Sequence, residues 1–456
     1  MLPSCHSALL TDLYELTMAA AYFDGGFNAR ASFELFVRSL PPERSYLIAA
    51  GLEQALDFLE QMRFQPAEID YLRQQPVFRH ISKDFFEYLR EFRFTGEVWA
   101  IPEGTAVFQE EPLLRVTAPI IGAQIVETFL LSIITFQTMI ASKAARMVEA
   151  AQGRAVIEFG TRRAHGPEAG TLAARAAYIG GCGGTSNVEA GQQFDIPVFG
   201  TLAHSFVMAY HEEEEAFRRF QQLFPEHAVL LVDTYDTLAA IDKIVASGLR
   251  PAAVRLDSGD LYELSREVRR KLDAAGLSKT KIFATSDLDE YVISELLARG
   301  AQVDAFGVGT SLATSKDAPS LGGVYKLVDV YSDNGPSYRA KLSGGKATYP
   351  GCKQVFRKSG PNGIYTGDLI ARCSEQHPSE MSLLTPVMMS GKRITPPASL
   401  SEIRERAQQE ISKLPAGVRR LHNPATYPVR FSRELQDLLE EFRTRFAQPI
   451  AKDGSR

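Results

Sequence analysis

One histidine in the sequence lies at a turn between elements, where its imidazole can act as a nucleophile. His204 follows an apolar run at 196–199 and the turn Gly200-Thr201-Leu202-Ala203, where a strand is expected to pass into a helix. Backbone N–H groups at a helix start favour anions. A nucleophilic imidazole needs a partner that fixes its tautomer, usually a carboxylate. Asp233, after the next apolar run, is the predicted partner and Asp236 the alternative, although a helix N-cap explains Asp233 equally well.

Three arginines also stand at the ends of apolar runs: Arg162, Arg163 and Arg255. The guanidinium group matches carboxylate and phosphate in a two-pronged geometry, so three of them on one face would indicate an anionic ligand. Asp257 and Asp260 follow Arg255 closely and could hold sugar hydroxyls, or Mg²⁺ through water. No individual Mg²⁺ ligand is predicted.

A glycine-containing turn offers a second anion site. Gly307, Gly309 and Thr310 lie where a strand is expected to give way to a helix, so a phosphate can approach the main-chain N–H groups closely. In barrel enzymes the loops after the last strands frequently bind phosphate. Ser286, one strand earlier, is predicted to complete the same cradle.

Two aromatic residues and two further histidines complete the set of candidate residues. Phe159 and Tyr14 could stack on a planar ring, although an aromatic side chain more often belongs to the core. His165, beside Arg163, is a plausible secondary binding residue. His211 precedes a run of four glutamates and is expected on a solvated helix face.

These residues need a framework that brings them to one edge. From residue 153 onward, short apolar runs alternate with helical stretches, and chemically active side chains follow nearly every run. The carboxyl ends of barrel strands form one face, so we predict an irregular, incomplete β/α barrel, with a doubly wound open sheet as the alternative. The predicted strands are 155–159, 196–199, 228–232, 252–256, 281–285 and 303–306, with a weaker one at 176–179.

The remaining chain is expected to form a mixed α/β domain. Residues 1–150 combine short strands with helices near 9–22 and 52–61, residues 151–325 hold the barrel, and residues 326–456 are strand-rich and then helical. The last segment either completes the N-terminal domain or forms a third domain. An apolar run from 119 to about 141 is interrupted by polar residues, and a charge at bilayer depth costs roughly 2.5 kcal/mol or more. We therefore predict a buried core helix and no membrane span.

Composition excludes several classes of protein. The chain has 456 residues, 50 Lys and Arg and 55 Asp and Glu, a net charge of −5, which does not suit a protein that coats nucleic acid. Four scattered cysteines argue against a disulfide framework and a structural zinc site, and they fit a reducing cytoplasm. Neither a signal peptide nor a Walker A motif is found.

Several blocks together resemble the nicotinate phosphoribosyltransferases, a family of NAD biosynthesis. The resemblance extends in order from about residue 9 to 357, so it is far more specific than any single motif. The blocks are Leu10-Thr11-Asp12-Leu13-Tyr14-Glu15-Leu16-Thr17-Met18, Glu158-Phe159-Gly160-Thr161-Arg162-Arg163-Ala164-His165-Gly166-Pro167, Gly184-Thr185-Ser186-Asn187, Gly200-Thr201-Leu202-Ala203-His204-Ser205, Val254-Arg255-Leu256-Asp257-Ser258-Gly259-Asp260-Leu261 and Gly307-Val308-Gly309-Thr310.

The resemblance implies a type II phosphoribosyltransferase fold and a reaction. Nicotinate would be joined to 5-phosphoribosyl 1-diphosphate, with Mg²⁺ and with ATP hydrolysis coupled through a phosphohistidine at His204, which Asp233 would orient. Tyr14 would come from the neighbouring subunit of a cytoplasmic homodimer. The resemblance assigns nicotinate to Tyr14, Phe159, Thr201 and Arg255 and the phosphoribosyl donor to Thr310. From the residues themselves we add Arg162 and Ser186 on the nicotinate side, and Arg163, Asp257, Ser286, Gly307 and Gly309 on the donor side.

One position bears on the choice of substrate. Nicotinamide-using relatives place an acid where this sequence has Ser186. An aspartate would repel the nicotinate carboxylate, whereas a serine can donate a hydrogen bond to it. Ser186 therefore predicts a strong preference for nicotinate over nicotinamide.

Three alternatives stay open at this stage. Nicotinamide or quinolinate could be the acceptor within the same chemistry. A barrel isomerase or aldolase would use the same phosphate loop. It would usually need a Schiff-base lysine or a glutamate base at a strand end, and only Glu158 comes close to meeting this requirement. A ligand-sensing relative without turnover is disfavoured by the intact His204, Asp233 and Arg255.

Overall fold

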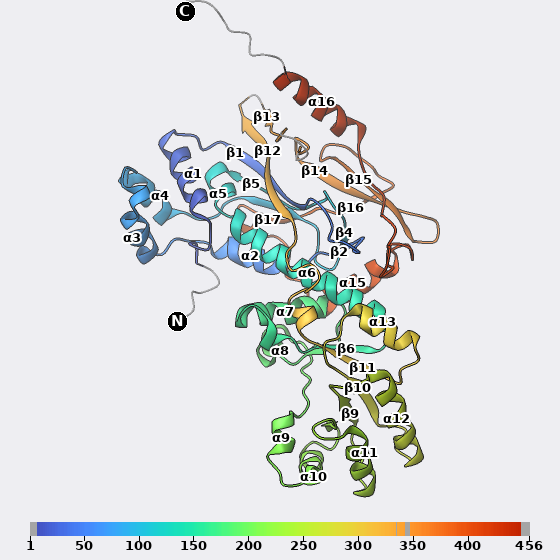
Figure 1. The fold of residues 1–456 in the computed structure, drawn as a ribbon. Coiled ribbons are helices and arrows are strands. Elements are labelled where there is room, and N and C mark those ends of the chain that lie inside the picture. The colour runs from blue at the N-terminus through green and yellow to red at the C-terminus, as the bar shows by residue number, and fades with distance from the viewer. Residues whose placement is uncertain (1–6, 334, 343–346, 448–456) are drawn as a thin grey trace, which may run out of the picture.

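The computed structural model describes residues 7–333, 335–342 and 347–447. They form two lobes joined by a long helix (Figure 1). The upper lobe is built from both ends of the chain, and the lower lobe from the middle. The lower lobe carries the strand ends that matter for chemistry.

The upper lobe is organised by a seven-stranded sheet to which both chain ends contribute. Within this sheet, strand β1 pairs antiparallel with β5 from the N-terminal part and with β12 from the C-terminal part. Of the two arrangements left open for the C-terminal segment, the structure shows the first for β12, β13, β17 and β18, which extend the N-terminal sheet, while β16, β14, β15 and β19 form a separate four-stranded sheet. The order is β13 (Gly335–Tyr338), β12 (Gly323–Ser332), β1 (Arg30–Val37), β5 (Pro112–Pro119), β3 (Glu97–Ala100), β17 (Thr385–Met389) and β18 (Lys392–Arg393).

The other elements outside the barrel lobe include two smaller sheets, β16-β14-β15-β19 and β2-β4. Strand β12 begins two residues before the predicted limit at 325. In the C-terminal segment, β13 is short and β14 (Lys353–Ser359) is the next strand. The helices are α1 (Leu13–Asp24), α2 (Leu52–Gln61), α3 (Pro66–Gln74), η1 (Pro76–Phe78), α4 (Lys83–Glu91), α5 (Ile120–Gln124), α15 (Leu400–Ser412) and α16 (Arg433–Ala447). The other strands are β2 (Leu47–Ile48), β4 (Ala106–Val107), β14 (Lys353–Ser359), β15 (Tyr365–Arg372), β16 (Met381–Ser382) and β19 (Val429–Phe431).

The long apolar helix α6 (Glu127–Ala150) runs between the lobes. Together with α5 it is long and apolar enough, by length and composition alone, to cross a membrane, yet most of its C-terminal half is buried. Lys143 is buried with its Nζ 2.5 Å from Glu290 and 2.7 Å from Asp317, and Arg146 Nε lies 3.0 Å from Glu290. Because buried charges are tolerated when paired, α6 is a core helix of this fold, as predicted.

The lower lobe contains six parallel strands that curl into an incomplete barrel. In spatial order they are β7 (Gly184–Thr185), β6 (Ala155–Glu158), β11 (Ala305–Val308), β10 (Lys281–Ala284), β9 (Ala253–Leu256) and β8 (Val229–Leu231). The barrel helices are η2 (Thr161–Arg163), α7 (Pro167–Ile179), α8 (Val188–Phe194), α9 (His204–Met208), α10 (Glu213–Leu223), α11 (Thr237–Ala246), α12 (Leu261–Ala274), α13 (Glu290–Ala298) and α14 (Thr310–Ala313).

The barrel is closed on one side and open on the other. The first and last strands in chain order meet, because β6 pairs with β11. Beyond β7 the sheet continues only as a single bridge from Thr185 to Val198, and no pairing in the described part of the chain joins Val198 to β8. This arrangement confirms the predicted irregular barrel.

Two predicted strands differ from the structure. The run 196–199 forms only the one bridge at Val198. The weak candidate at 176–179 is wrong: it is the last turn of α7, in a run rich in alanine, the strongest helix former. The strand of this unit is Gly184–Thr185, too short to show a pattern in the sequence.

Candidate active site

The carboxyl ends of the barrel strands bring most of the predicted residues to one rim. Arg255 is the centre of the polar network there, with its side chain only 12% exposed. Its Nε donates to Thr285 Oγ1 at 2.9 Å, one terminal nitrogen donates to Thr201 Oγ1 at 2.9 Å, and the other to Asp257 Oδ1 at 2.7 Å. Three anchors from three loops hold the guanidinium in one orientation.

Thr285 is a member of this network that the sequence analysis did not single out. It is buried, and its hydroxyl contacts Arg255, Asp257 and the carbonyl of Leu256. Its sequence signal was weak because it is the last residue of an apolar run, where threonine normally indicates only β-propensity.

Asp257 is held as a charged group. Burial by itself would raise the pKa of its carboxyl, but the hydrogen bond from Thr285 and the charge of Arg255 outweigh burial and lower it below the usual value. The side chain therefore carries a negative charge at neutral pH. The rim is thus a mixed surface of opposite charges rather than a purely cationic one.

His204 lies on the same rim as the first residue of α9. Its Nδ1 is 3.2 Å from Thr234 Oγ1, and its Nε2 is 3.9 Å from Asp257 Oδ2. The imidazole is therefore close to the Arg255–Asp257 pair, as the sequence analysis required. The hydroxyl at Nδ1 can fix the tautomer of the ring.

Asp233 does not make the predicted contact with His204. Its Oδ2 instead accepts from the backbone N–H of Asp257 at 3.2 Å and from the Ser258 hydroxyl at 2.5 Å. The turn after β8 directs Thr234 toward the imidazole and Asp233 toward the next strand end. The alternative, Asp236, is the N-cap of α11.

One oxygen of Asp233 has no partner. Asp233 Oδ1 is buried, and no hydrogen bond to it is found within the described residues. Asp260, which could hold a sugar hydroxyl or Mg²⁺ through water, caps α12 with its Oδ1, which accepts from the N–H groups of Tyr262 and Glu263. Asp233 and Asp257 therefore have free capacity at this rim, and among the described residues Oδ2 of Asp260 accepts no hydrogen bond either.

Phe159 occupies the space that a side chain at Gly307 would need. A Cβ there would lie 2.6 Å from the Thr285 methyl group and 2.9 Å from the Phe159 ring. The ring also meets Phe283 edge-on at 5.6 Å between centroids. Gly307 is therefore explained by packing beneath Phe159, while Gly309 and Thr310 lie at the more open end of the turn.

Ser186 and Glu158 join the ends of β6 and β7. The backbone N–H of Ser186 donates to the carbonyl of Glu158 at 2.9 Å. The Glu158 carboxylate is fully buried and accepts from Thr185 Oγ1 at 2.6 Å and from the backbone of Gly160. Burial raises the pKa of Glu158 despite these hydrogen bonds. Glu158 thus links the ends of β6 and β7 through its hydrogen bonds, and its burial keeps it from contacting a ligand.

Exposed basic side chains stand beside this rim. Arg162 and Arg163 lie in the short helix η2 and are exposed, as is His165. No ion pair or side-chain hydrogen bond engages either arginine within the described residues. His211 is exposed beside Glu212, as expected for a solvated face.

Ser286 has a strained backbone, with φ of 103°. A non-glycine residue at positive φ costs about 1–3 kcal/mol, so Ser286→Gly is expected to raise the midpoint of thermal unfolding by about 2–4 °C. Ser286→Ala keeps the strain and should leave the midpoint unchanged. Differential scanning fluorimetry of the three proteins checks this, and equal midpoints for the glycine and alanine variants would contradict it.

Comparison with known proteins identifies the family. Three family models match: the nicotinate phosphoribosyltransferase N-terminal domain over residues 9–135, the nicotinate phosphoribosyltransferase family over 155–331 and the C-terminal domain over 379–439. The chain belongs to the nicotinate phosphoribosyltransferase family. Its rim residues lie in the central match, and α1 lies in the first.

Individual members of the family are similar over nearly the whole chain. Nicotinate phosphoribosyltransferase pncB2 of Mycobacterium tuberculosis is 48% identical and covers 93% of this chain and 91% of its own. The Bacillus subtilis enzyme is 40% identical, covering 94% and 93%. The crystal structure of human nicotinic acid phosphoribosyltransferase is 31% identical, with a TM-score of 0.83, and covers 94% of this chain and 99% of its own.

Within one chain of this family member, Tyr14 does not join the barrel residues. It lies on α1 in the upper lobe, far from β6 and β9 in Figure 1. Its side chain is exposed, and its hydroxyl reaches Glu127 Oε1 at 3.4 Å. A role for Tyr14 beside Phe159 therefore requires a second chain.

Glu15, buried beside Tyr14, titrates near neutral pH. Burial raises its pKa to about 7, although hydrogen bonds from Gln124 and Tyr14 act in the opposite direction. Because the native state then binds the proton more tightly than the unfolded state, Glu15 should lower stability as pH rises from about 4.3 to 7.

The Glu15→Gln variant is therefore expected to show a flatter dependence of thermal midpoint on pH. The slope that it removes is at most about 1.4 kcal/mol per pH unit. Unfolding scans between pH 4.5 and 8 measure it, and Glu168→Gln, at an exposed position of α7, is the matched control. Identical slopes in wild type and Glu15→Gln would contradict the assignment.

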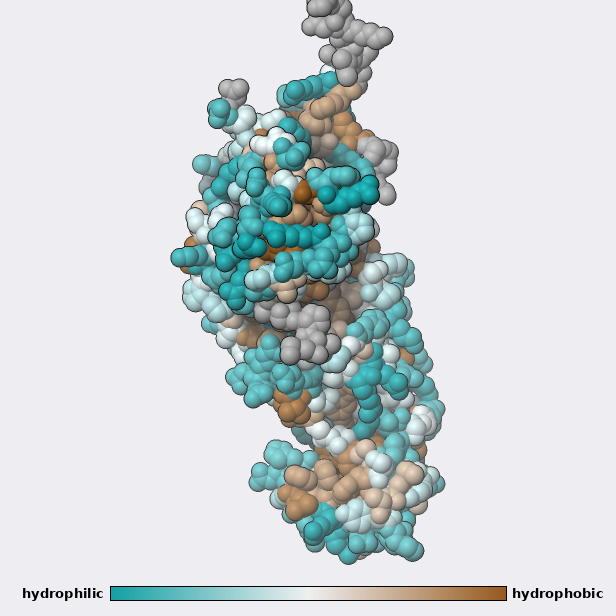
Figure 2. Space-filling model, turned by 90° about the vertical axis from the view of Figure 1, so that its left-hand side faces the viewer, coloured by the Kyte–Doolittle hydropathy of each residue, from teal (hydrophilic) through white to brown (hydrophobic). Residues whose placement is uncertain are grey.

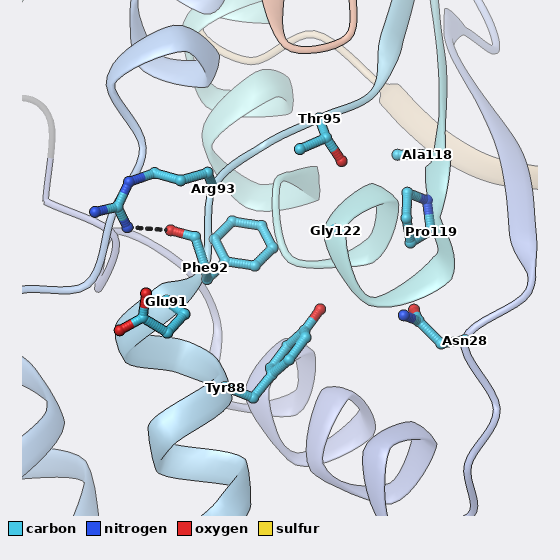
Figure 3. Close-up of a pocket in the computed structure, with 9 residues that line it drawn as sticks. All are labelled: Asn28, Tyr88, Glu91, Phe92, Arg93, Thr95, Ala118, Pro119 and Gly122. Carbon is cyan, nitrogen blue, oxygen red and sulfur yellow. Dashed lines mark hydrogen bonds between the residues drawn. The ribbon is translucent and has the colours of Figure 1, made fainter.

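The upper lobe also contains a pocket that is separate from the rim. It has a volume of about 280 Å³ and lies between α4, α5 and the end of β5, with Tyr88 and Phe92 on one side (Figure 3). None of the candidate site residues lines it.

Proposed function

We propose that this chain joins nicotinate to 5-phosphoribosyl 1-diphosphate, giving nicotinate mononucleotide and diphosphate. The observation that carries the proposal is the fixed position of the Arg255 guanidinium. Thr201, Thr285 and Asp257 hold it by hydrogen bonds. His204 and Phe159 lie at the same rim. A fixed guanidinium suits a carboxylate, and a neighbouring aromatic ring suits a pyridine. The names of the relatives support the same reaction.

The acceptor side of the reaction needs little acid–base chemistry. The pyridine nitrogen of nicotinate already carries a lone pair, so it can attack the ribose carbon as the diphosphate leaves. The chain has to orient the ring and stabilise charge. Arg255, Thr201 and Ser186 would hold the carboxylate. Phe159 and the partner subunit's Tyr14 would stack on the two faces of the ring, and Arg162 would contact its edge.

The donor would occupy the opposite side of the rim. Gly309 and Thr310 present backbone and hydroxyl groups at the start of α14, and Ser286 lies on the neighbouring strand end. Arg163 is exposed and free to meet a phosphate, and Asp257 can accept from ribose hydroxyls. Gly307 would act indirectly, because Phe159 covers it.

Mg²⁺ is proposed as the metal of this reaction. The unpartnered Asp233 Oδ1 and the ionised Asp257 supply the carboxylate oxygens that Mg²⁺ prefers. When bound, the ion would neutralise charge on the diphosphate group. The role of Asp233 is thus proposed to be on the donor side rather than on the imidazole.

ATP coupling is proposed to use His204. An imidazole nitrogen would take the γ-phosphoryl group of ATP as the bond from phosphorus to the bridging oxygen breaks and ADP leaves. Hydrolysis of the phosphohistidine by water would then release phosphate. The Thr234 contact at Nδ1 supports this role because it orients the ring, and Arg163 would recognise the added charge.

A homodimer is proposed to complete the site. Near the start of α1, Leu10, Leu13 and Tyr14 are exposed by 42%, 54% and 47%. On the barrel lobe, Val198, Phe199, Met208 and Tyr235 are exposed at the open side by 48%, 46%, 63% and 65%. Figure 2 shows apolar surface on this lower lobe. Two such patches fit a twofold-symmetric, antiparallel pair in which α1 of each chain meets the barrel of the other.

Mixed dimers test the shared site. Tyr14→Ala and Arg255→Met chains are each expected to be nearly inactive as homodimers. Co-expression under two tags should restore about a quarter of wild-type activity, because half of the dimers are mixed and each of these has one intact site. No restoration would mean that Tyr14 acts within its own chain or not at all.

The reaction itself is tested by measuring diphosphate release. The donor, Mg²⁺ and ATP are held constant, while nicotinate, nicotinamide or quinolinate is the single variable. Release with nicotinate alone supports the proposal, and the Ser186 argument predicts a far lower kcat/KM for nicotinamide. Release with quinolinate and loss of carbon dioxide, or release with none, would overturn it.

We also place the enzyme in the cytoplasm. The three described cysteines, Cys182, Cys352 and Cys373, are free thiols. Free thiols are usual in a reducing compartment. The substrates and the ATP that the reaction would use are small soluble molecules.

A further inference from the structure

Two cysteines face each other across a hairpin in the upper lobe. In the antiparallel pair β14–β15, Lys353 lies opposite Arg372, so Cys352 and Cys373 form the next pair outward. The backbone N–H of Cys373 donates to the Cys352 carbonyl at 2.9 Å. Residues paired in this way have Cα atoms about 5.5 Å apart and side chains on the same face. This spacing is in the range that a disulfide spans.

The two thiols differ in environment. Cys352 is buried, with its Sγ 3.8 Å from the Tyr331 hydroxyl, whereas Cys373 is exposed. A hydrogen bond from the Cys352 thiol, helped by the charge of Arg115, lowers the pKa of Cys373 to about 7, although burial acts against this. The same contact raises the pKa of Cys352. Since the thiolate is the nucleophile, an exposed reactive sulfur stands beside a buried resolving one.

We propose that Cys352 and Cys373 are a redox-modification site, at which a peroxide closes a reversible intrachain disulfide. The Cys373 thiolate attacks one peroxide oxygen and the O–O bond breaks; the leaving hydroxide takes up the proton that the Cys373 thiol had released to solvent, so a sulfenic acid and one water result. The Cys352 sulfur then attacks that sulfenic sulfur, the S–O bond breaks, and its proton leaves with the hydroxide as a second water. Two thiols are oxidised by two electrons, and hydrogen peroxide is reduced to two waters.

The site is separate from the rim. Cys352 packs against Asp329 and Tyr331 of β12, in the upper lobe of Figure 1, and the barrel strands lie in the lower lobe. The bond would close a loop of about 20 residues and constrain the unfolded chain. Oxidation is therefore expected to raise the thermal midpoint by a few degrees without changing the rate of the reaction.

Cys182 is an internal control. It is fully buried at the end of α7, and burial raises the pKa of its thiol. It should therefore resist the peroxide dose that oxidises Cys373. Cys5 lies outside the described residues, so the test uses a chain with Cys5→Ser.

The experiment treats the full Cys5→Ser chain with about one equivalent of hydrogen peroxide, alkylates the remaining thiols and maps peptides by mass. The expected result is a Cys352–Cys373 linked peptide, lighter by two hydrogen atoms, that dithiothreitol separates. Cys352→Ser should leave Cys373 as a sulfenic acid that dimedone traps, and Cys373→Ser should remain unoxidised. The absence of the linked peptide, or oxidation of Cys182 to the same extent, would overturn the proposal.

Discussion

Replacing Arg255 by methionine is expected to lower kcat/KM for nicotinate by about 30- to 1,000-fold. Methionine keeps much of the length of the side chain but leaves the nicotinate carboxylate without a charged partner, a loss of about 2–4 kcal/mol. It also frees the hydroxyls of Thr201 and Thr285, which now hold the guanidinium. Initial rates of diphosphate release over a range of nicotinate concentrations measure the effect.

Two comparisons separate this effect from misfolding. Arg255→Lys keeps the charge but not the planar fork, so an intermediate loss of about 10-fold or more is expected. Nicotinamide has no carboxylate, so its low kcat/KM should change much less in Arg255→Met. If nicotinate and nicotinamide lose the same factor, Arg255 does not recognise the carboxylate. Unchanged thermal midpoints confirm that the variants are folded.

Replacing His204 by alanine is expected to abolish the acid-labile label that γ-labelled ATP leaves on the wild-type chain. The stimulation of product formation by ATP should disappear with it, whereas the rate without ATP should persist, because Arg255 and the Thr310 turn remain. Autoradiography after alkaline electrophoresis and rate measurements with and without ATP give the two readouts.

The matched control for His204→Ala is Thr234→Val. Valine preserves the shape of threonine but removes the hydroxyl that lies 3.2 Å from His204 Nδ1. The ring then loses the group that fixes its tautomer, so labelling should be slower rather than absent. Label that survives in His204→Ala would place the phosphoryl group elsewhere and remove the histidine from the mechanism.

Much of the barrel could be predicted because it depends on local pattern. Apolar runs of four or five residues marked β6, β9, β10 and β11, and the rule that active residues follow the carboxyl ends of strands placed His204 near Arg255. Strand β7 was missed because two residues carry no pattern. Residues 176–179, which end a helix, were assigned to a strand because a short apolar run does not distinguish a strand from a helix.

Side-chain partners were harder to predict than positions. The sequence places Asp233 at the correct strand end, yet the direction of a turn decides whether Asp233 or Thr234 meets the imidazole. Thr285 could not be identified from the sequence for a similar reason, because its contact with Arg255 arises only in the folded structure. Gly307 illustrates the reverse case, in which a residue predicted to bind a ligand is explained by the packing of Phe159.

The seven-stranded sheet has a consequence for how the protein is made. Strand β1 ends at Val37, but its partner β12 has been synthesised only when Ser332 has been added. Strand β17, which pairs with β3, is complete only at Met389. A ribosome adding about 5–20 residues per second needs roughly 15–60 s to supply β12. The barrel strands, which end at Val308, emerge earlier. During synthesis the N-terminal strands therefore keep one edge without hydrogen-bonding partners, and such an edge is a target for chaperones. The middle of the polypeptide folds first.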